Sequence, residues 1–235
     1  MQLFYNPDIN PGAASFLFDK EESRHIVKVL RKKEGDSVHI TNGKGYLFSS
    51  EIIFANEKKC EVKITDEQFF EAIPYSLHLA VAPTKLNDRY EWFLEKAVEI
   101  GITEITPIIC DHSERTVFKA DRFEKILQSA MKQSLQYYMP VLHEPTPFST
   151  FVSNQKTGQL FIAHCEETDK KLLKHVLQPQ QQVTILIGPE GDFSNKEITQ
   201  ALSLNYVPVS LGNTRLRTET AAIVAGHSVA FINEN

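Results

Sequence analysis

Two short apolar runs near the end of the chain, Val183 to Ile187 and Val207 to Leu211, each stop at a loop that contains glycine. A segment with helical character, Asn195 to Leu204, lies between them. Continuous apolar runs of this length, separated by a helix, are typical of parallel strands that are buried on both faces. Because parallel sheets bind ligands beyond the carboxyl ends of their strands, the pattern predicts a ligand site at the two loops.

The same alternation of strand and helix occurs upstream. Further strands are predicted at Leu77 to Val81, Ile105 to Cys110 and Leu160 to Ala163. Helices are predicted from Asp88, as the capping residue, to Gly101 and from Asp121 to about Tyr138. Such alternation predicts an α/β fold, a mostly parallel sheet with helices on both faces.

The first seventy residues have a different pattern, which is rich in short strands. Apolar and polar residues alternate at Val38 to Ile40 and at Cys60 to Ile64, and Asn42-Gly43 is a strong hairpin signal. The pattern of the first seventy residues therefore predicts a small β-barrel. Residues 66–74 show no periodic element and end in Pro74, so the boundary is predicted between a domain of residues 1–72 and a domain of residues 73–235.

One segment of the predicted barrel is basic, although the chain as a whole carries a formal charge of -5. A helix is predicted from Glu22 to Arg31, with Arg24, Lys28 and Arg31 on one face and Ile26, Val27, Val29 and Leu30 on the other. An acidic chain has no general bias toward nucleic acid, so any such binding must be local. This row of three basic side chains fits either a surface that contacts phosphates or an ordinary solvated face of the helix.

Composition narrows the classes of protein further. No apolar run is long enough to span a bilayer, and residues 1–10 lack the pattern of a signal peptide, so a cytoplasmic location is predicted. The three cysteines, Cys60, Cys110 and Cys165, lie far apart without paired spacing, which argues against disulfides and zinc. Cys110-Asp111-His112 resembles half of a metal site, but no second ligand pair has suitable spacing, and no metal is predicted.

The two C-terminal loops favour a flat, uncharged ligand group over a phosphate. Neither G-x-G-x-x-G nor G-x-x-x-x-G-K-[ST] occurs among the ten glycines. The apolar side chains of Ile187, Leu211 and Leu216 flank the loops, and such walls suit an adenine ring. A Gly-Pro-Glu-Gly turn alone can be an ordinary connection between a strand and a helix, whereas the two loops together are far more specific.

The loop residues closely resemble those of the SPOUT methyltransferases. The resemblance rests on Ile187-Gly188-Pro189-Glu190-Gly191 and on Leu211-Gly212 followed by Leu216-Arg217-Thr218-Glu219-Thr220-Ala221. Within that superfamily the chain is similar to the family that methylates N3 of a uridine in 16S ribosomal RNA. Matching residues upstream, among them Arg24-His25, Lys85 and Gln133-Ser134, extend the resemblance over nearly the whole chain.

The resemblance implies an N-terminal PUA-like barrel that binds RNA and a C-terminal domain with a deep trefoil knot. It also implies S-adenosylmethionine as the cofactor, a homodimer, and 16S ribosomal RNA within the small ribosomal subunit as the substrate. Leu135-Gln136-Tyr137-Tyr138 departs from the family, many members of which have a basic residue here. Tyr137 or Tyr138 could instead stack on a base.

The resemblance assigns roles to individual residues. The implied cofactor-binding residues are Ala163, Ile187, Gly188, Pro189, Glu190, Gly191, Leu211, Gly212, Leu216, Arg217, Thr218, Thr220 and Ala221. Arg217 is the candidate for stabilising charge on the uracil oxygens, with an ion pair to Glu219 or Glu190 as the alternative. Glu190 and Glu219 are the candidate proton acceptors, and each also fits a structural role. His164-Cys165 fits a cofactor loop better than a nucleophile, because methyl transfer to nitrogen needs no covalent step on the enzyme.

The candidate RNA-binding residues are Arg24, His25, Lys28 and Arg31 in the first domain and Lys85, Arg89 and Arg115 in the second. For His25, packing against the barrel is an equally good interpretation. Two other functions stay open at this stage. One is a non-catalytic RNA-binding or ribosome-assembly protein, and the other is the same fold acting on transfer RNA or on a ribose hydroxyl.

Overall fold

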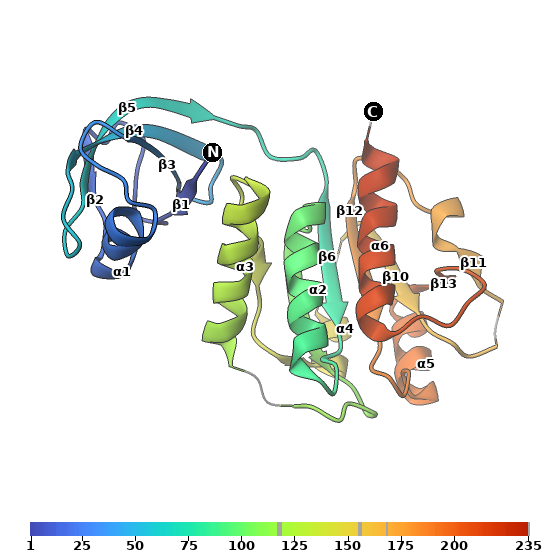
Figure 1. Ribbon diagram of the computed structural model, residues 1–235. Coiled ribbons are helices and arrows are strands. Elements are labelled where there is room, and N and C mark those ends of the chain that lie inside the picture. Colours follow the sequence, from blue (N-terminus) through green and yellow to red (C-terminus); the bar gives the residue numbers. More distant parts are fainter. Residues whose placement is uncertain (117–118, 155–156, 168, 235) are drawn as a thin grey trace. The chain divides into compact units, whose positions relative to one another are not determined.

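The computed structural model describes residues 1–116, 119–154, 157–167 and 169–234 (Figure 1). The chain divides into two compact units, of which the first comprises Met1–Ala72 with Met131–Met139 and the second Ile73–Ala130 with Pro140–Asn235. Segment 131–139 is held in the first unit by bonds such as that from the Tyr138 hydroxyl to the Phe70 carbonyl, at 2.8 Å. The sequence pattern gives no sign of this long-range association.

The first unit is a five-stranded sheet that wraps around a single core. Its strands are β1 (Leu3–Tyr5), β2 (Ser15–Leu17), β3 (Ser37–Thr41), β4 (Tyr46–Phe54) and β5 (Glu61–Phe69), in the order β1-β3-β4-β5-β2. The predicted hairpin joins β3 to β4, and the Asn42 side chain accepts bonds from the backbone N–H groups of Lys44 and Tyr46. Apolar residues from all five strands and the intervening helical segment fill the core.

The predicted basic helix differs from expectation in both its extent and its geometry. It consists of α1 (Lys20–Arg24), capped by Asp19, and a π-helical turn η1 (His25–Val29). Arg31 follows the helix in a left-handed conformation, with φ 56°. The prediction of a single α-helix from Glu22 to Arg31 was therefore wrong, because the second half is a π turn and the left-handed residue ends the helix before Arg31. The apolar face is also narrower than predicted, since Val29 is 65% exposed.

The second unit contains the predicted parallel sheet. Its principal strands are β6 (Ser76–Val81), β7 (Glu104–Ile109), β10 (Gln159–Ala163), β12 (Gln182–Ile187) and β13 (Val207–Ser210). The order is β11-β13-β10-β12-β6-β7-β8, and every pair is parallel. The strands β8 (Val141–Leu142), β9 (Thr146–Pro147) and β11 (Lys171–Leu172) were missed, because two residues carry no periodicity. The predicted α/β fold is confirmed, whereas the trefoil knot stays a prediction.

Helices cover both faces of this sheet (Figure 1). They are α2 (Asn87–Ile100), α3 (Ala120–Ser134), α4 (Phe148–Ser153), α5 (Asn195–Ser203) and α6 (Thr218–Asn233), and the short 3-10 helix η2 spans Leu173–His175. Helices α2 and α6 pack together, with Gly226 of α6 close to Leu79 of β6. The next residue, Ala80, points to the opposite face, where it joins the core beneath α4 and α5.

The helix ends show which local signals were reliable. Gly101 terminates α2 in the left-handed conformation, as predicted, with φ 85°. Asp88 was wrong as the cap, because α2 begins at Asn87 after Leu86. Helix α3 ends at Ser134, four residues before the predicted Tyr138, since Leu135 turns to φ 56°. In the described ranges, no helix combines the length and the apolar character that crossing a bilayer requires.

Candidate functional site

Three loops meet at the carboxyl edge of the sheet in the second unit. Ala163, the last residue of β10, is paired with Ile187 at the end of β12 and with Val209 of β13. Because the three strands are parallel neighbours, the loops that follow them emerge side by side. Residues of these loops line a cavity of about 690 Å³ and a smaller one of about 280 Å³. The larger volume lies within the range of about 300–1,000 Å³ that is typical of ligand sites.

The structure brings together nearly all of the predicted cofactor-binding residues. Ala163, Gly191, Leu211, Gly212, Leu216 and Ala221 line the larger cavity. Ala163, Ile187, Gly188, Pro189, Glu190, Leu216, Arg217, Thr218 and Ala221 line the smaller one. Thr220 is the exception, because it lines a different cavity of about 380 Å³ together with Arg89 and Trp92.

Asp192 fixes the loop after β12 to the loop after β10, and no sequence pattern singles this residue out. Its Oδ2 atom accepts a 2.7 Å hydrogen bond from the backbone N–H of Cys165, and its Oδ1 atom accepts one from Phe193. The backbone of Asp192 is left-handed, with φ 64°. The Thr218 hydroxyl completes the arrangement by donating to the Gly188 carbonyl at 3.0 Å. Side chains therefore hold all three loops in place.

Both glycines of the Gly-Pro-Glu-Gly turn are closely packed against neighbouring residues. A Cβ atom on Gly188 would lie 3.1 Å from the Phe193 ring and 3.2 Å from its backbone nitrogen. A Cβ atom on Gly191 would lie 3.1 Å from the Cβ of His112. The turn therefore has little tolerance for a larger residue at either position.

Cys110-Asp111-His112, which resembled half of a metal site, instead braces this turn. The Nδ1 atom of His112 lies 3.1 Å from the Gly191 carbonyl oxygen and 3.0 Å from that of Asp192. Asp111 donates its backbone N–H to Glu197 and accepts a bond from the Ser194 hydroxyl at 2.6 Å. The thiol of Cys110 is buried, and burial raises its pKa. A protonated, buried thiol is neither a good nucleophile nor a metal ligand.

His164 is a buried polar side chain that lines the larger cavity. His164 is 7% exposed, and neither nitrogen of its ring has a hydrogen-bond partner among the described residues. Burial lowers the pKa of this imidazole, and the nearby Lys170 ammonium lowers it further. Buried polar groups are normally hydrogen-bonded, so His164 is poised to bond with a ligand or a water. The sequence pattern predicts a strand end and a cofactor loop at this residue, but not that its imidazole is buried without a partner.

The three candidate catalytic residues do not share one cavity. Arg217 and Glu190 both line the smaller cavity, whereas Glu219 lines the one beside Arg89. Glu219 is buried, and its Oε1 atom lies 4.0 Å from Nε of Arg89. Glu190 accepts a 2.9 Å bond from the backbone N–H of Lys85. The alternative ion pairs of Arg217 with Glu190 or Glu219 are absent among the described residues.

The candidate RNA contacts of the first unit lie on and after α1. Arg24 and Arg31 are exposed, and Lys28 lies 4.0 Å from Glu57. His25 packs edge-on against Phe4, with ring centroids 6.1 Å apart, and lies 3.6 Å from Glu22. The packing interpretation of His25 therefore has direct support in its contacts.

Tyr137 and Tyr138 also belong to the first unit, where both contact Phe70. The Tyr137 ring lies 4.4 Å from that of Phe70, and the Tyr138 hydroxyl donates to the Phe70 carbonyl. Tyr138 also approaches Gly45 so closely that a Cβ atom there would overlap its hydroxyl. These contacts give both tyrosines a structural role.

The candidate RNA contacts of the second unit are Lys85, Arg89 and Arg115. Lys85 forms a 2.8 Å ion pair with Glu114, and this carboxylate raises the pKa of the lysine. Arg89 faces Glu219, as described above. Arg115 is half-buried in the segment that precedes α3. Lys85 and Arg89 thus both have acidic neighbours that partly offset their charge.

Comparison with known proteins assigns the chain to the RNA methyltransferases. A family described as the RNA methyltransferase domain matches residues 71–230, and one described as the RNA methyltransferase PUA domain matches residues 18–65. Ribosomal RNA small subunit methyltransferase E of Buchnera aphidicola (subspecies Acyrthosiphon pisum) is 32% identical over 89% of this chain and 85% of its own length. The chain belongs to the family of ribosomal RNA small subunit methyltransferase E, which confirms the predicted resemblance to a family that methylates small-subunit ribosomal RNA.

Solved structures agree over the whole chain. The crystal structure of a probable rRNA methyltransferase from Porphyromonas gingivalis is 39% identical, with a TM-score of 0.92 over 99% of this chain and 98% of that one. A ribosomal RNA small subunit methyltransferase E from Neisseria gonorrhoeae, bound to S-adenosyl methionine, is 25% identical, with a TM-score of 0.87 over 99% and 98% of the two chains. The fold and the family are therefore established together.

Proposed function

We propose that the protein is an S-adenosylmethionine-dependent methyltransferase that methylates N3 of a uridine in 16S ribosomal RNA. The observation that carries the proposal is the convergence of three loops on a cavity of suitable size, with Arg217 beside it, in a chain of this family. Residues 1–72 act as a PUA-like RNA-binding domain and residues 73–235 as the methyltransferase domain with its trefoil knot. The protein acts in the cytoplasm as a homodimer, on RNA of the small ribosomal subunit.

The residues of the site fit S-adenosylmethionine in their chemistry. Ile187, Leu211 and Leu216 offer apolar walls, and Gly188 and Gly212 bring the backbone of their turns to the same cavities. The two ring nitrogens of His164 add buried polar groups that need a partner. When bound, the cofactor supplies an electrophilic methyl group on its sulfonium.

The protein must place uracil N3 in line with that methyl group and accept the N3 proton. Positioning alone can contribute about 7–11 kcal/mol to such a reaction. Arg217 stabilises negative charge on the uracil oxygens, and it stands at the N-terminus of α6, where the helix dipole favours an anion. Glu190 is the better candidate proton acceptor, because it lines the same cavity as Arg217, whereas Glu219 does not.

Each unit supplies candidate RNA contacts, namely Arg24, His25, Lys28 and Arg31 in the first and Lys85, Arg89 and Arg115 in the second. Contacts from such side chains to phosphates position the RNA and weaken with salt, but they carry no sequence information. Selection of one uridine therefore depends on the shape of the folded RNA.

The proposal is tested by mass spectrometry of nucleosides from 16S ribosomal RNA. A deletion strain should lack one N3-methyluridine, and the purified protein with S-adenosylmethionine should restore it. Intact 30S particles and free RNA are compared as substrates. A deletion strain with unchanged 16S methylation would refute the proposal, favouring an RNA-binding or assembly role if no methyl group is lost elsewhere, or another RNA target if one is.

A further inference from the structure

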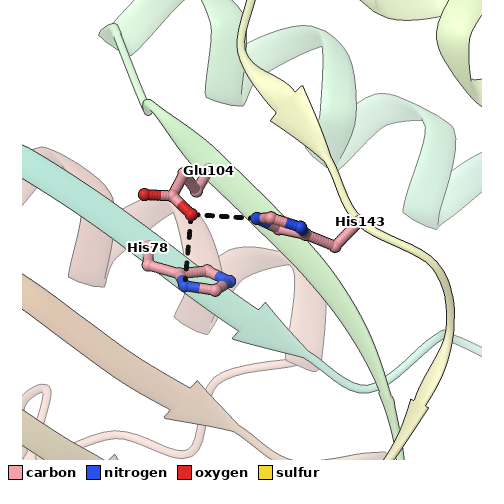
Figure 2. A group of neighbouring side chains, drawn as sticks. All are labelled: His78, Glu104 and His143. Atoms are coloured by element: carbon pink, nitrogen blue, oxygen red, sulfur yellow. Dashed lines mark hydrogen bonds and ion pairs between the residues drawn. The ribbon is translucent and has the colours of Figure 1, made fainter. Parts of the chain in front are cut away.

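Two histidines and a glutamate form a compact cluster in the second unit (Figure 2). His78 comes from β6, Glu104 opens β7, and His143 follows β8. The Oε2 atom of Glu104 lies 2.9 Å from Nε2 of His143 and 3.7 Å from Nδ1 of His78. Figure 2 shows both imidazoles directed at the same carboxylate oxygen, and the three ligand atoms lie within 4.8 Å of one another.

The cluster is separate from the cofactor cavities. His78 is the third residue of β6 and is paired in register with Glu104, the first residue of β7. The cofactor loops instead follow the last residues of β10, β12 and β13. Because all these strands are parallel, the cluster lies toward the opposite edge of the sheet.

Neighbouring groups hold the ligand atoms in place. The Nε2 atom of His78 bonds to the Thr106 hydroxyl at 2.7 Å, which leaves Nδ1 facing Glu104. The His78 ring also packs edge-on against Phe151, with centroids 5.2 Å apart. His143 is anchored through its backbone N–H, which donates to the Ile105 carbonyl at 2.8 Å. A ligating histidine whose second nitrogen is bonded to an oriented partner is characteristic of protein metal sites.

We propose that His78, Glu104 and His143 bind a transition-metal dication, with Zn²⁺ as the best-suited ion. Two imidazole nitrogens and one carboxylate oxygen are a zinc ligand set. The spacings of 2.9 Å and 3.7 Å around the Glu104 oxygen are compatible with zinc bonds of about 2.0–2.2 Å. Calcium and magnesium prefer oxygen ligands and fit less well. His78 is buried while Glu104 and His143 are partly exposed, so the ion can enter from solvent.

The bound ion has a structural role. It links β6, β7 and the segment after β8, which are far apart in the sequence. Since binding favours the folded state, the metal should raise the midpoint of thermal unfolding.

The test is titration of the full-length, chelator-treated protein with Co²⁺, followed by its visible absorption, and with Zn²⁺ by calorimetry. Wild type should bind one ion per chain at this site, and thermal unfolding should shift upward. His143→Ala and Glu104→Gln, both at partly exposed positions, should weaken binding by at least about tenfold. His175→Ala removes an exposed histidine outside the cluster and should bind as wild type does.

Two results would overturn the metal site. One is that wild type binds neither ion in the micromolar range. The other is that His143→Ala and Glu104→Gln retain the wild-type affinity, stoichiometry and thermal shift, which would place the bound metal elsewhere. Circular dichroism of each variant checks that the fold is intact. Either result would leave the three residues as a hydrogen-bonded cluster without a metal.

Discussion

The carboxylate of Asp192 accepts a 2.7 Å hydrogen bond from the backbone N–H of Cys165. This bond joins the loop after β12 to the loop after β10, and both residues line the larger and the smaller cavity. A hydrogen bond to a charged acceptor stabilises a structure more than a hydrogen bond to a neutral acceptor does, commonly by about 1.5–3 kcal/mol in all. The side chain of Asp192 therefore links two of the three loops that line these cavities.

Asp192→Asn should weaken S-adenosylmethionine binding by roughly three- to tenfold, because the amide keeps an acceptor but loses the charge. Asparagine tolerates the left-handed backbone of this position, so local strain does not confuse the result. Calorimetry measures the affinity. Asp66→Asn, at an exposed position of β5, makes the same chemical change elsewhere and should have no effect. Equal affinity in both variants would show that the bond does not organise the site.

The sequence predicted the sheet and the loops that line the cavities, but not the interactions that hold these loops together. Apolar runs such as Val183 to Ile187 report burial, and burial is encoded locally. The bond that Cys165 donates to Asp192 and the bond between His112 and Gly191 join residues 27 and 79 positions apart. No local periodicity records such pairs. The η1 turn was missed for a related reason, since π-helical turns have no distinctive composition.

The cavity walls should be essential for cofactor binding. Leu211→Asp places a charge in the larger cavity, and Gly191→Trp adds a ring where even a Cβ atom would lie 3.1 Å from His112. Both variants should abolish detectable S-adenosylmethionine binding in calorimetry. Leu202→Asp, at an exposed position of α5, is the matched control and should bind normally. Normal binding by both cavity variants would remove the site from these loops.

Arg217→Ala should lose most turnover while it keeps the fold and much of the cofactor affinity. Removal of a group that stabilises charge in the transition state costs about 10²–10³-fold in kcat. Single-turnover methylation of 16S ribosomal RNA measures the loss, and Arg217→Lys should recover part of it. Lys196→Ala removes the same charge from an exposed site on α5 and should leave turnover unchanged. Near wild-type turnover in Arg217→Ala would mean that the arginine is structural.

The two candidate proton acceptors can be separated by neutral substitutions. Glu190→Gln keeps an oxygen for the Lys85 backbone N–H but cannot accept the N3 proton, so turnover should fall by about 10²-fold or more. Glu219→Gln should mainly reduce stability, because it leaves Arg89 without its buried carboxylate. Turnover at several pH values and thermal unfolding distinguish the two effects. If instead Glu219→Gln loses turnover and Glu190→Gln does not, the proton acceptor is Glu219.

His164 should make the stability of the protein depend on pH. Its pKa in the folded state is lowered from the ordinary value of 6.5, chiefly by burial and then by Lys170, although Asp192 and Glu166 oppose the shift. Below pH 6.5 the unfolded chain therefore binds a proton at this histidine more readily than the folded chain does. The free energy of unfolding should consequently decrease as the pH is lowered below 6.5. Well above pH 6.5 the imidazole is neutral in both states, and the stability no longer depends on its protonation.

Denaturant unfolding between pH 5 and pH 8 measures the effect. His164→Gln keeps a polar side chain but cannot titrate, so its stability should decline less than that of wild type as the pH falls. A residual slope is expected from His39, whose pKa is also lowered by burial. His175→Gln, at an exposed position, should follow the wild-type curve. If His164→Gln also follows that curve, the buried imidazole is not the group that limits stability in acid.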